Sequence, residues 1–120
     1  MSPILLTRGS IVIVDFASTN PGSGVRPAVV VQNDRDNARM ANTIVAQITS
    51  NVSRAHEPTQ LLIDQGYADW GTSGLRRPSV VNCSSVATVQ QQHVTRVIGQ
   101  LSSLTMREID ACLKAAFGLT

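Results

Sequence analysis

Short runs of apolar residues, many of them β-branched, recur along most of the chain and are separated by turn-forming residues. Three runs are apolar on both faces and too short for helices, which predicts buried strands at Ser10–Phe16, Ala28–Val31 and Thr43–Ile48. Weaker strands are predicted at Gln60–Ile63 and Arg96–Ile98, and residues 79–89 form either two short strands or one bulged strand. Five or six such strands are typical of a small β barrel or half-barrel.

The segments between these strands carry the chemistry of turns and loops. Ala17–Val25 concentrates Ser, Asn, Pro and Gly, which predicts a surface loop that ends at Arg26 and Pro27. Pro27 has no N–H group, so it fits only the first position of a strand or an edge. Asn33–Asn42 is polar and turn-like, and Asp64–Arg77 is predicted to be a long connection anchored by Trp70.

One helix is predicted, at the carboxyl end of the chain. Thr105 and Glu108 have the spacing of a capping box, in which the two side chains satisfy the first free N–H groups of a helix. Gly118 is the expected stop. Apolar residues then follow the period of a helix whose one face packs on the sheet: Ile109, Cys112, Leu113, Ala116 and Phe117.

The composition fits one domain over residues 1–120, of which 42% are apolar and 15% charged. Ten Lys and Arg against eight Asp and Glu leave a formal charge of +2, so any nucleic-acid site has to be local. Cys83 and Cys112 have no CxxC spacing, and we expect both to be reduced core residues. The apolar stretch at the amino end is too short for a signal peptide or a membrane-spanning segment, which favours a cytoplasmic protein that does not associate with a membrane.

Candidate chemistry gathers at strand ends. No metal-binding motif, phosphate-binding loop or catalytic Ser elbow is present, so no metal or cofactor is expected. Arg26 follows the first loop, Thr49 and Ser50 follow a strand, and Arg76 and Arg77 precede another. Arg, together with hydroxyl groups, suits a phosphodiester, because the guanidinium binds phosphate through two hydrogen bonds.

Several of these segments, taken in order, resemble the MazF/PemK family of toxin endoribonucleases. The resemblance covers nearly all of residues 8–119 and is carried by Val12–Phe16, Val25–Asp34, Ile44–Ser50, Ser73–Val81 and Val97–Leu101, with a closing helix that ends at Gly118. It implies an α+β, mainly β fold: a small SH3-like barrel of the type shared with the CcdB gyrase poisons, with a C-terminal helix.

The resemblance also implies a function. Members of this family are homodimers that cut single-stranded mRNA at short sequences without metal, leaving a 2′,3′-cyclic phosphate and a 5′-hydroxyl, and a cognate antitoxin blocks the site. Carried over by position, Arg26 and Thr49 match the catalytic pair. An Arg fork and a Thr hydroxyl can stabilise the charge that builds on the phosphate oxygens during attack. The candidate RNA-binding residues are Asn20, Ser23, Ser50, Arg76, Arg77 and Ser85.

Departures from the family pattern keep a second function open. The loop before Arg26 has no carboxylate, and Ser85 and Ala87 stand where relatives often have Gln and Arg. These changes fit a non-catalytic binding module, either a gyrase poison or a degenerate toxin that only binds an antitoxin. The general base is not assigned: Arg26 is too weak a base at neutral pH, His56 and His93 lie in polar segments, and Asp15 is at most a positioning residue.

Overall fold

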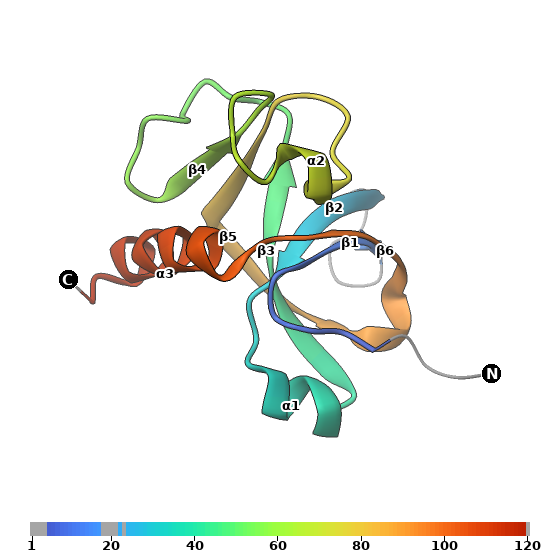
Figure 1. The fold of residues 1–120 in the computed structure, drawn as a ribbon. Coiled ribbons are helices and arrows are strands. Elements are labelled where there is room, and N and C mark those ends of the chain that lie inside the picture. The colour runs from blue at the N-terminus through green and yellow to red at the C-terminus, as the bar shows by residue number, and fades with distance from the viewer. Residues whose placement is uncertain (1–4, 18–21, 23, 120) are drawn as a thin grey trace.

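The computed structural model describes residues 5–17, 22 and 24–119, and these form one antiparallel sheet with helices packed on it (Figure 1). The strands lie in the order β4-β5-β3-β2-β1-β6. Their bounds are β1 Ser10–Asp15, β2 Val25–Val30, β3 Asn42–Thr49, β4 Gln60–Ile63, β5 Ser79–Gln90 and β6 Val94–Gln100. The helices are α1 Asp34–Arg39, α2 Trp70–Ser73 and α3 Ser103–Phe117, with a 3-10 turn, η1, at Gln91–His93.

The expected mainly β, α+β class is confirmed, but the sheet does not close. Within the described residues, β4 and β6 are the two edges of the sheet, so the arrangement is barrel-like rather than a complete barrel. No helix in this part of the chain is long and apolar enough to cross a membrane.

Alternate residues along the strands supply two apolar cores, one on each face of the sheet. Ile11, Val29 and Ile48 belong to the core that α3 covers with Ile109 and Cys112. Val12, Val14, Ala28, Val30 and Val45 belong to the other core. Because successive side chains of a strand point to opposite faces, strands that are apolar throughout are those buried on both sides.

The predicted thiol state is confirmed: Cys83 and Cys112 are buried and free. Burial raises the pKa of the Cys83 thiol to about 12, and the neighbouring Cys112 adds to the shift. Both groups are therefore neutral at physiological pH.

Most predicted elements are present. Residues 79–90 form a single bulged strand, the second of the two predicted alternatives, and its pairing with β3 shifts between Ala46 and Gln47. Two details differ. The capping box is wrong: α3 begins earlier, and the Ser102 hydroxyl accepts from the N–H of Thr105 at 3.3 Å. Phe117 is 60% exposed, so it does not join the packed face of α3.

The short helix α1 lies in the segment predicted to be turn-like. Its N-cap is Asn33, whose side chain accepts from the N–H of Asp36 at 2.9 Å. With six residues and no apolar period, α1 offers no helical pattern to detect. The Asn33 cap is the local signal that could have revealed it.

Close backbone contact fixes α2 against β6. A Cβ atom on Gly99 would lie 2.2 Å from the carbonyl oxygen of Ser73, and one on Gly74 would lie 2.2 Å from that of Ile98. Gly74 also has a φ of +75°, which disfavours other residues. The two glycines therefore hold the start of the connection to β5, which carries Arg76 and Arg77, beside the middle of β6.

Candidate functional site

Arg26 and Thr49 lie at neighbouring strand ends. The β2–β3 pairing joins Ala28 to Gln47, and the same register continued by two residues sets Arg26 opposite Thr49. Residues directly opposite in an antiparallel pair point to the same face. The structure therefore brings together the two predicted catalytic residues, which are 23 positions apart in the chain (49 − 26).

Pro27 explains why the pairing of β2 with β3 stops just before these two residues. Val31 donates its N–H to the carbonyl oxygen of Ile44, so alternate residues of this strand direct their N–H groups toward β3. Position 27 is one of these, and proline has no N–H to donate. Pro27 is the third residue of β2, which lies between β1 and β3, so the predicted first or edge position is wrong. It is tolerated because its missing N–H faces β3 where the ladder ends. The ladder accordingly ends at Ala28 and Gln47, and Arg26 and Thr49 lie beyond its last pair.

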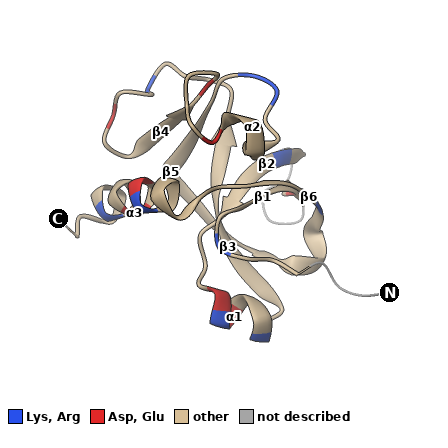
Figure 2. Ribbon diagram, viewed as in Figure 1, with Lys and Arg blue, Asp and Glu red and all other residues tan. Residues whose placement is uncertain are grey.

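One cavity, here named the arginine cavity, has a volume of about 680 Å³. Its sheet wall is formed by Ile13, Pro27 and Ile48. Among the described residues, four cations and no Asp or Glu line it: Arg26, Arg76, Arg77 and Arg96. In Figure 2 basic residues mark the end of β2 and the connection between α2 and β5. Such a cavity attracts anionic groups.

The second cavity, here named the amide cavity, has a volume of about 300 Å³ and is lined by Gln47, Gln60 and Asn82, together with Arg54 and Asn51. Arg26, Ile48 and Thr49 line both cavities. By strand alternation, the wall of the arginine cavity and the amides of the second belong to opposite faces of the sheet. Arg26 and Thr49 thus lie where the two cavities meet.

The Thr49 hydroxyl has a defined orientation. Its oxygen accepts a hydrogen bond from the N–H of Asn51 at 3.1 Å, in the turn that follows β3. Since that lone pair is occupied, the hydroxyl hydrogen remains to be donated to a bound group. Thr49 is half-buried and Arg26 is exposed, so both can be reached from solvent.

Only some of the other residues predicted to bind RNA line a cavity. Ser50, Arg76 and Arg77 line the arginine cavity, whereas Ser85 lines neither cavity. Asn20 and Ser23 lie outside the described residues. The carboxylate of Asp15 accepts from the N–H of Ala17 at 3.0 Å and so holds the turn after β1.

Several lining residues were missing from the predicted set. Arg96 is opposite Ile13 on β1, and Gln47, Gln60 and Asn82 are neighbours across three strands. Their sequence signal is weak, because only the register of the sheet brings them together. Neither His56 nor His93 lines either cavity. Among residues 5–17, 22 and 24–119, no group of three or more His, Cys, Asp and Glu is arranged to hold a metal ion.

Comparisons with known proteins agree on one family. The sequence model of the family described as PemK-like, MazF-like toxin of type II toxin–antitoxin systems matches residues 7–117. The chain is 30% identical over 118 residues to the endoribonuclease EndoA of Bacillus subtilis (strain 168), covering 97% of each protein.

Solved structures show the same fold. A mycobacterial endoribonuclease in complex with its cognate antitoxin has a TM-score of 0.74 and 23% identity, over 96% of this chain and 97% of that one. A MazE–MazF structure from Deinococcus radiodurans has a TM-score of 0.74 and 18% identity, over 98% of this chain and 100% of that one.

Proposed function

The chain belongs to the PemK-like, MazF-like family of toxins of type II toxin–antitoxin systems, and from this membership we propose that it is an endoribonuclease acting on single-stranded RNA. The observation that carries the proposal is the meeting of Arg26 and Thr49 at the junction of two cavities, one of which is lined by four arginines. The proposed products are a 2′,3′-cyclic phosphate and a 5′-hydroxyl, formed without a metal ion at short recognition sequences.

The proposed reaction is an internal transfer at phosphorus. The 2′-oxygen loses its proton and bonds to phosphorus, while the bond from phosphorus to the 5′-oxygen breaks and that oxygen gains a proton. Negative charge builds on the two non-bridging oxygens. The Arg26 guanidinium and the Thr49 hydroxyl donate hydrogen bonds to these oxygens, and fixed donors of this kind stabilise the transition state more than the substrate.

The arginine cavity supplies the rest of the RNA site. Arg76 and Arg77 on one side and Arg96 on the other fit a sugar–phosphate backbone that passes Arg26. Ser50 adds a hydroxyl to the same wall. Binding by such a surface is expected to weaken steeply as the salt concentration rises, because phosphate contacts release counterions.

A cognate antitoxin is the proposed protein partner. The described part of this surface has four arginines and no carboxylate, which favours an acidic segment that would compete with RNA for the arginine cavity. The proposed assembly is a homodimer, since β6 is an edge strand whose unpaired backbone groups favour contact with a second chain.

The test is cleavage of a long single-stranded RNA in EDTA by the purified chain, beside Arg26→Ala and Thr49→Val. Fragment ends are mapped by sequencing and by detection of the cyclic phosphate. Discrete cuts by the unmodified protein, reduced about 100-fold or more in either variant, are expected. Intact RNA after incubation with folded, dimeric protein would contradict the proposal and favour the non-catalytic binding module.

A further inference from the structure

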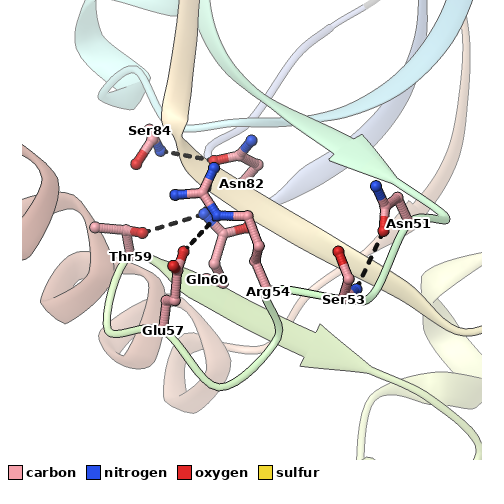
Figure 3. Close-up of polar contacts among 8 residues, drawn as sticks. All are labelled: Asn51, Ser53, Arg54, Glu57, Thr59, Gln60, Asn82 and Ser84. Carbon is pink, nitrogen blue, oxygen red and sulfur yellow. Dashed lines mark hydrogen bonds and ion pairs between the residues drawn. The ribbon is translucent and has the colours of Figure 1, made fainter.

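A row of three side-chain amides crosses the sheet beside the catalytic pair. The register sets Gln47 of β3 opposite Asn82 of β5, and Asn82 opposite Gln60 of β4, so all three point to one face. Gln60 donates to Asn82 over 2.8 Å, although 22 residues separate them in the chain. Figure 3 draws Gln60 and Asn82 together with Arg54. The row forms one wall of the amide cavity.

One backbone group fixes the orientation of the amides. The N–H of Ser84 donates to the Asn82 side chain at 3.0 Å, so the atom facing it is the oxygen, Oδ1. Gln60 must then present its nitrogen, Nε2, to the same oxygen, and Nε2 donates its second hydrogen to Thr59 at 3.1 Å. The polarity of the pair therefore follows from a single N–H group.

This arrangement leaves one donor and one acceptor. Among the described residues, Nδ2 of Asn82 and Oε1 of Gln60 make no other hydrogen bond. Gln60 is only 7% exposed. Among the described residues, the fully buried side-chain polar atom without a partner is Oδ1 of Asn42, so Oε1 of Gln60 is not fully buried. Oε1 of Gln60 is therefore open to the cavity rather than sealed in the protein.

The distance from the amides to the catalytic pair suits one nucleotide. Gln47 precedes Thr49 by two residues on the same face, about 7 Å along the strand, and Asn82 lies opposite Gln47 on the next strand, about 5 Å to the side. Strand geometry therefore sets Asn82 about 8 Å from Thr49, with Gln60 one strand further. The distance to Asn82 is of the same order as the reach from a phosphate to the edge of its own base. A phosphate held between Arg26 and Thr49 thus brings an adjacent base to the amide cavity.

Arg54 supplies a flat cation to the lining of the same cavity. Its Nε donates to the carboxylate of Glu57 at 2.6 Å, which holds the guanidinium at the cavity. The loop that carries it is folded by local bonds, including Ser53 N–H to the Asn51 side chain at 3.1 Å. A guanidinium plane stacks well on a nucleobase.

We propose that the amide cavity is a nucleobase subsite, in which Asn82 Nδ2 and Gln60 Oε1 bind the hydrogen-bonding edge of one base next to the scissile phosphate and Arg54 stacks on its face. The inference rests on the proposed ribonuclease function. A base suits the cavity better than a second phosphate, because a phosphate offers no hydrogen to the amide oxygen at neutral pH. Asn82 and Gln60 are thus specificity-determining residues for one position of the recognition sequence.

The decisive variant is Asn82→Asp. A carboxylate still accepts from Ser84 and Gln60, so the fold is retained, but the donor at Nδ2 becomes an acceptor. Ser84→Asp is the matched control, because it adds the same charge close to Asn82 at an exposed position that lines neither cavity, and it keeps the N–H that Asn82 accepts. Cut sites in a random-sequence RNA pool are sequenced for each protein, and the base frequencies at each position around the cut are compared.

For Asn82→Asp we expect the base preference to change at least about fivefold at one position beside the cut and to remain at the others. Ser84→Asp should keep the original preference at every position. Gln60→Met removes the acceptor at similar volume and should weaken the preference at that same position. Unchanged preferences in both Asn82→Asp and Gln60→Met would overturn the inference while leaving the ribonuclease intact. RNA left uncut by the unmodified protein would overturn the proposed function, and the subsite with it.

Discussion

At the scale of single residues, the site depends on where ordinary side chains are placed. Arg26 and Thr49 are common residue types, and each acts in the proposed reaction only as a hydrogen-bond donor. What distinguishes them is that the register of β2 and β3 sets them opposite each other beyond the last paired residues. The Thr49 oxygen accepts from the N–H of Asn51, which leaves the hydroxyl hydrogen available for the proposed bond to substrate.

This geometry predicts that only the hydroxyl of Thr49 matters, not its methyl group. Thr49→Ser should keep the rate of RNA cleavage within a few-fold, whereas Thr49→Val should lower kcat about 100-fold by removing one donor to the transition state. Thr88→Val, at an exposed position of β5, is the control. Single-turnover cleavage measures the effect, and equal rates for the Ser and Val variants would remove Thr49 from the mechanism.

The sequence could predict that Arg26 and Thr49 lie at strand ends, because each adjoins a contiguous apolar run, and their catalytic role stays a prediction. It could not predict Gln60 and Asn82 as partners, since 22 residues separate them and the bulge in β5 sets the register between them. The same holds for Arg96. The sequence shows only that it belongs to a short strand, and the pairing of β6 with β1 brings it to the arginine cavity.

At the scale of elements, local pattern predicted strands better than short helices. The β-branched runs of β1 and β3 and the apolar period of α3 are strong signals that packing does not override. The helices α1 and α2 have six and four residues, too few to show a period. The predicted start of α3 lies too late in the chain, because Thr105 matches a capping pattern whereas Ser102 makes the cap.

The glycine contact between α2 and β6 gives an element-scale prediction. Gly99→Ala places a methyl group against the backbone of Ser73, which should lower the free energy of unfolding by about 2 kcal/mol or more and displace the wall that carries Arg76 and Arg77. Gly71→Ala is the matched control within α2, because a Cβ there meets no atom within 4 Å. Urea unfolding and RNA affinity measure both effects, and equal stability of the two variants would contradict the close contact.

At the scale of the whole molecule, the two cavities place the proposed substrate across the end of the sheet rather than on one face. Arg26 and Thr49 belong to both cavities, so the RNA backbone and an adjacent base can be held on opposite sides of one strand end. An edge strand, β6, lies beside the arginine cavity and contributes Arg96.

The assembly prediction belongs to this scale. Light scattering on the purified chain at micromolar concentration should give about twice the protomer mass of 12.8 kDa. Light scattering with an acidic antitoxin peptide should show a heavier complex. A separate binding assay should show that this complex no longer binds RNA. A mass equal to one protomer, unchanged across concentrations, would exclude the homodimer.

The buried thiols predict how stability depends on alkaline pH. The pKa of Cys83 is raised from 9.0 to about 12 in the folded protein, so the unfolded chain ionises first as pH rises. Stability from this thiol is complete below about pH 9 and is lost between pH 9 and 12, by up to about 1.4 kcal/mol per pH unit. Urea unfolding from pH 8 to 11 should show a steeper decline for the unmodified protein than for Cys83→Val. Parallel declines would contradict a neutral buried Cys83.

Pro27 has a consequence for altering this protein by design. Most substitutions at a functional site remove a group, but every replacement of a proline adds a backbone donor. Pro27→Ala would supply the N–H that β3 lacks and let the pairing run on to Arg26 and Thr49. The missing N–H of Pro27 thus keeps Arg26 and Thr49, between the two cavities, free of strand pairing. A variant of normal stability could still lose its substrate site because its sheet pairing had become more regular.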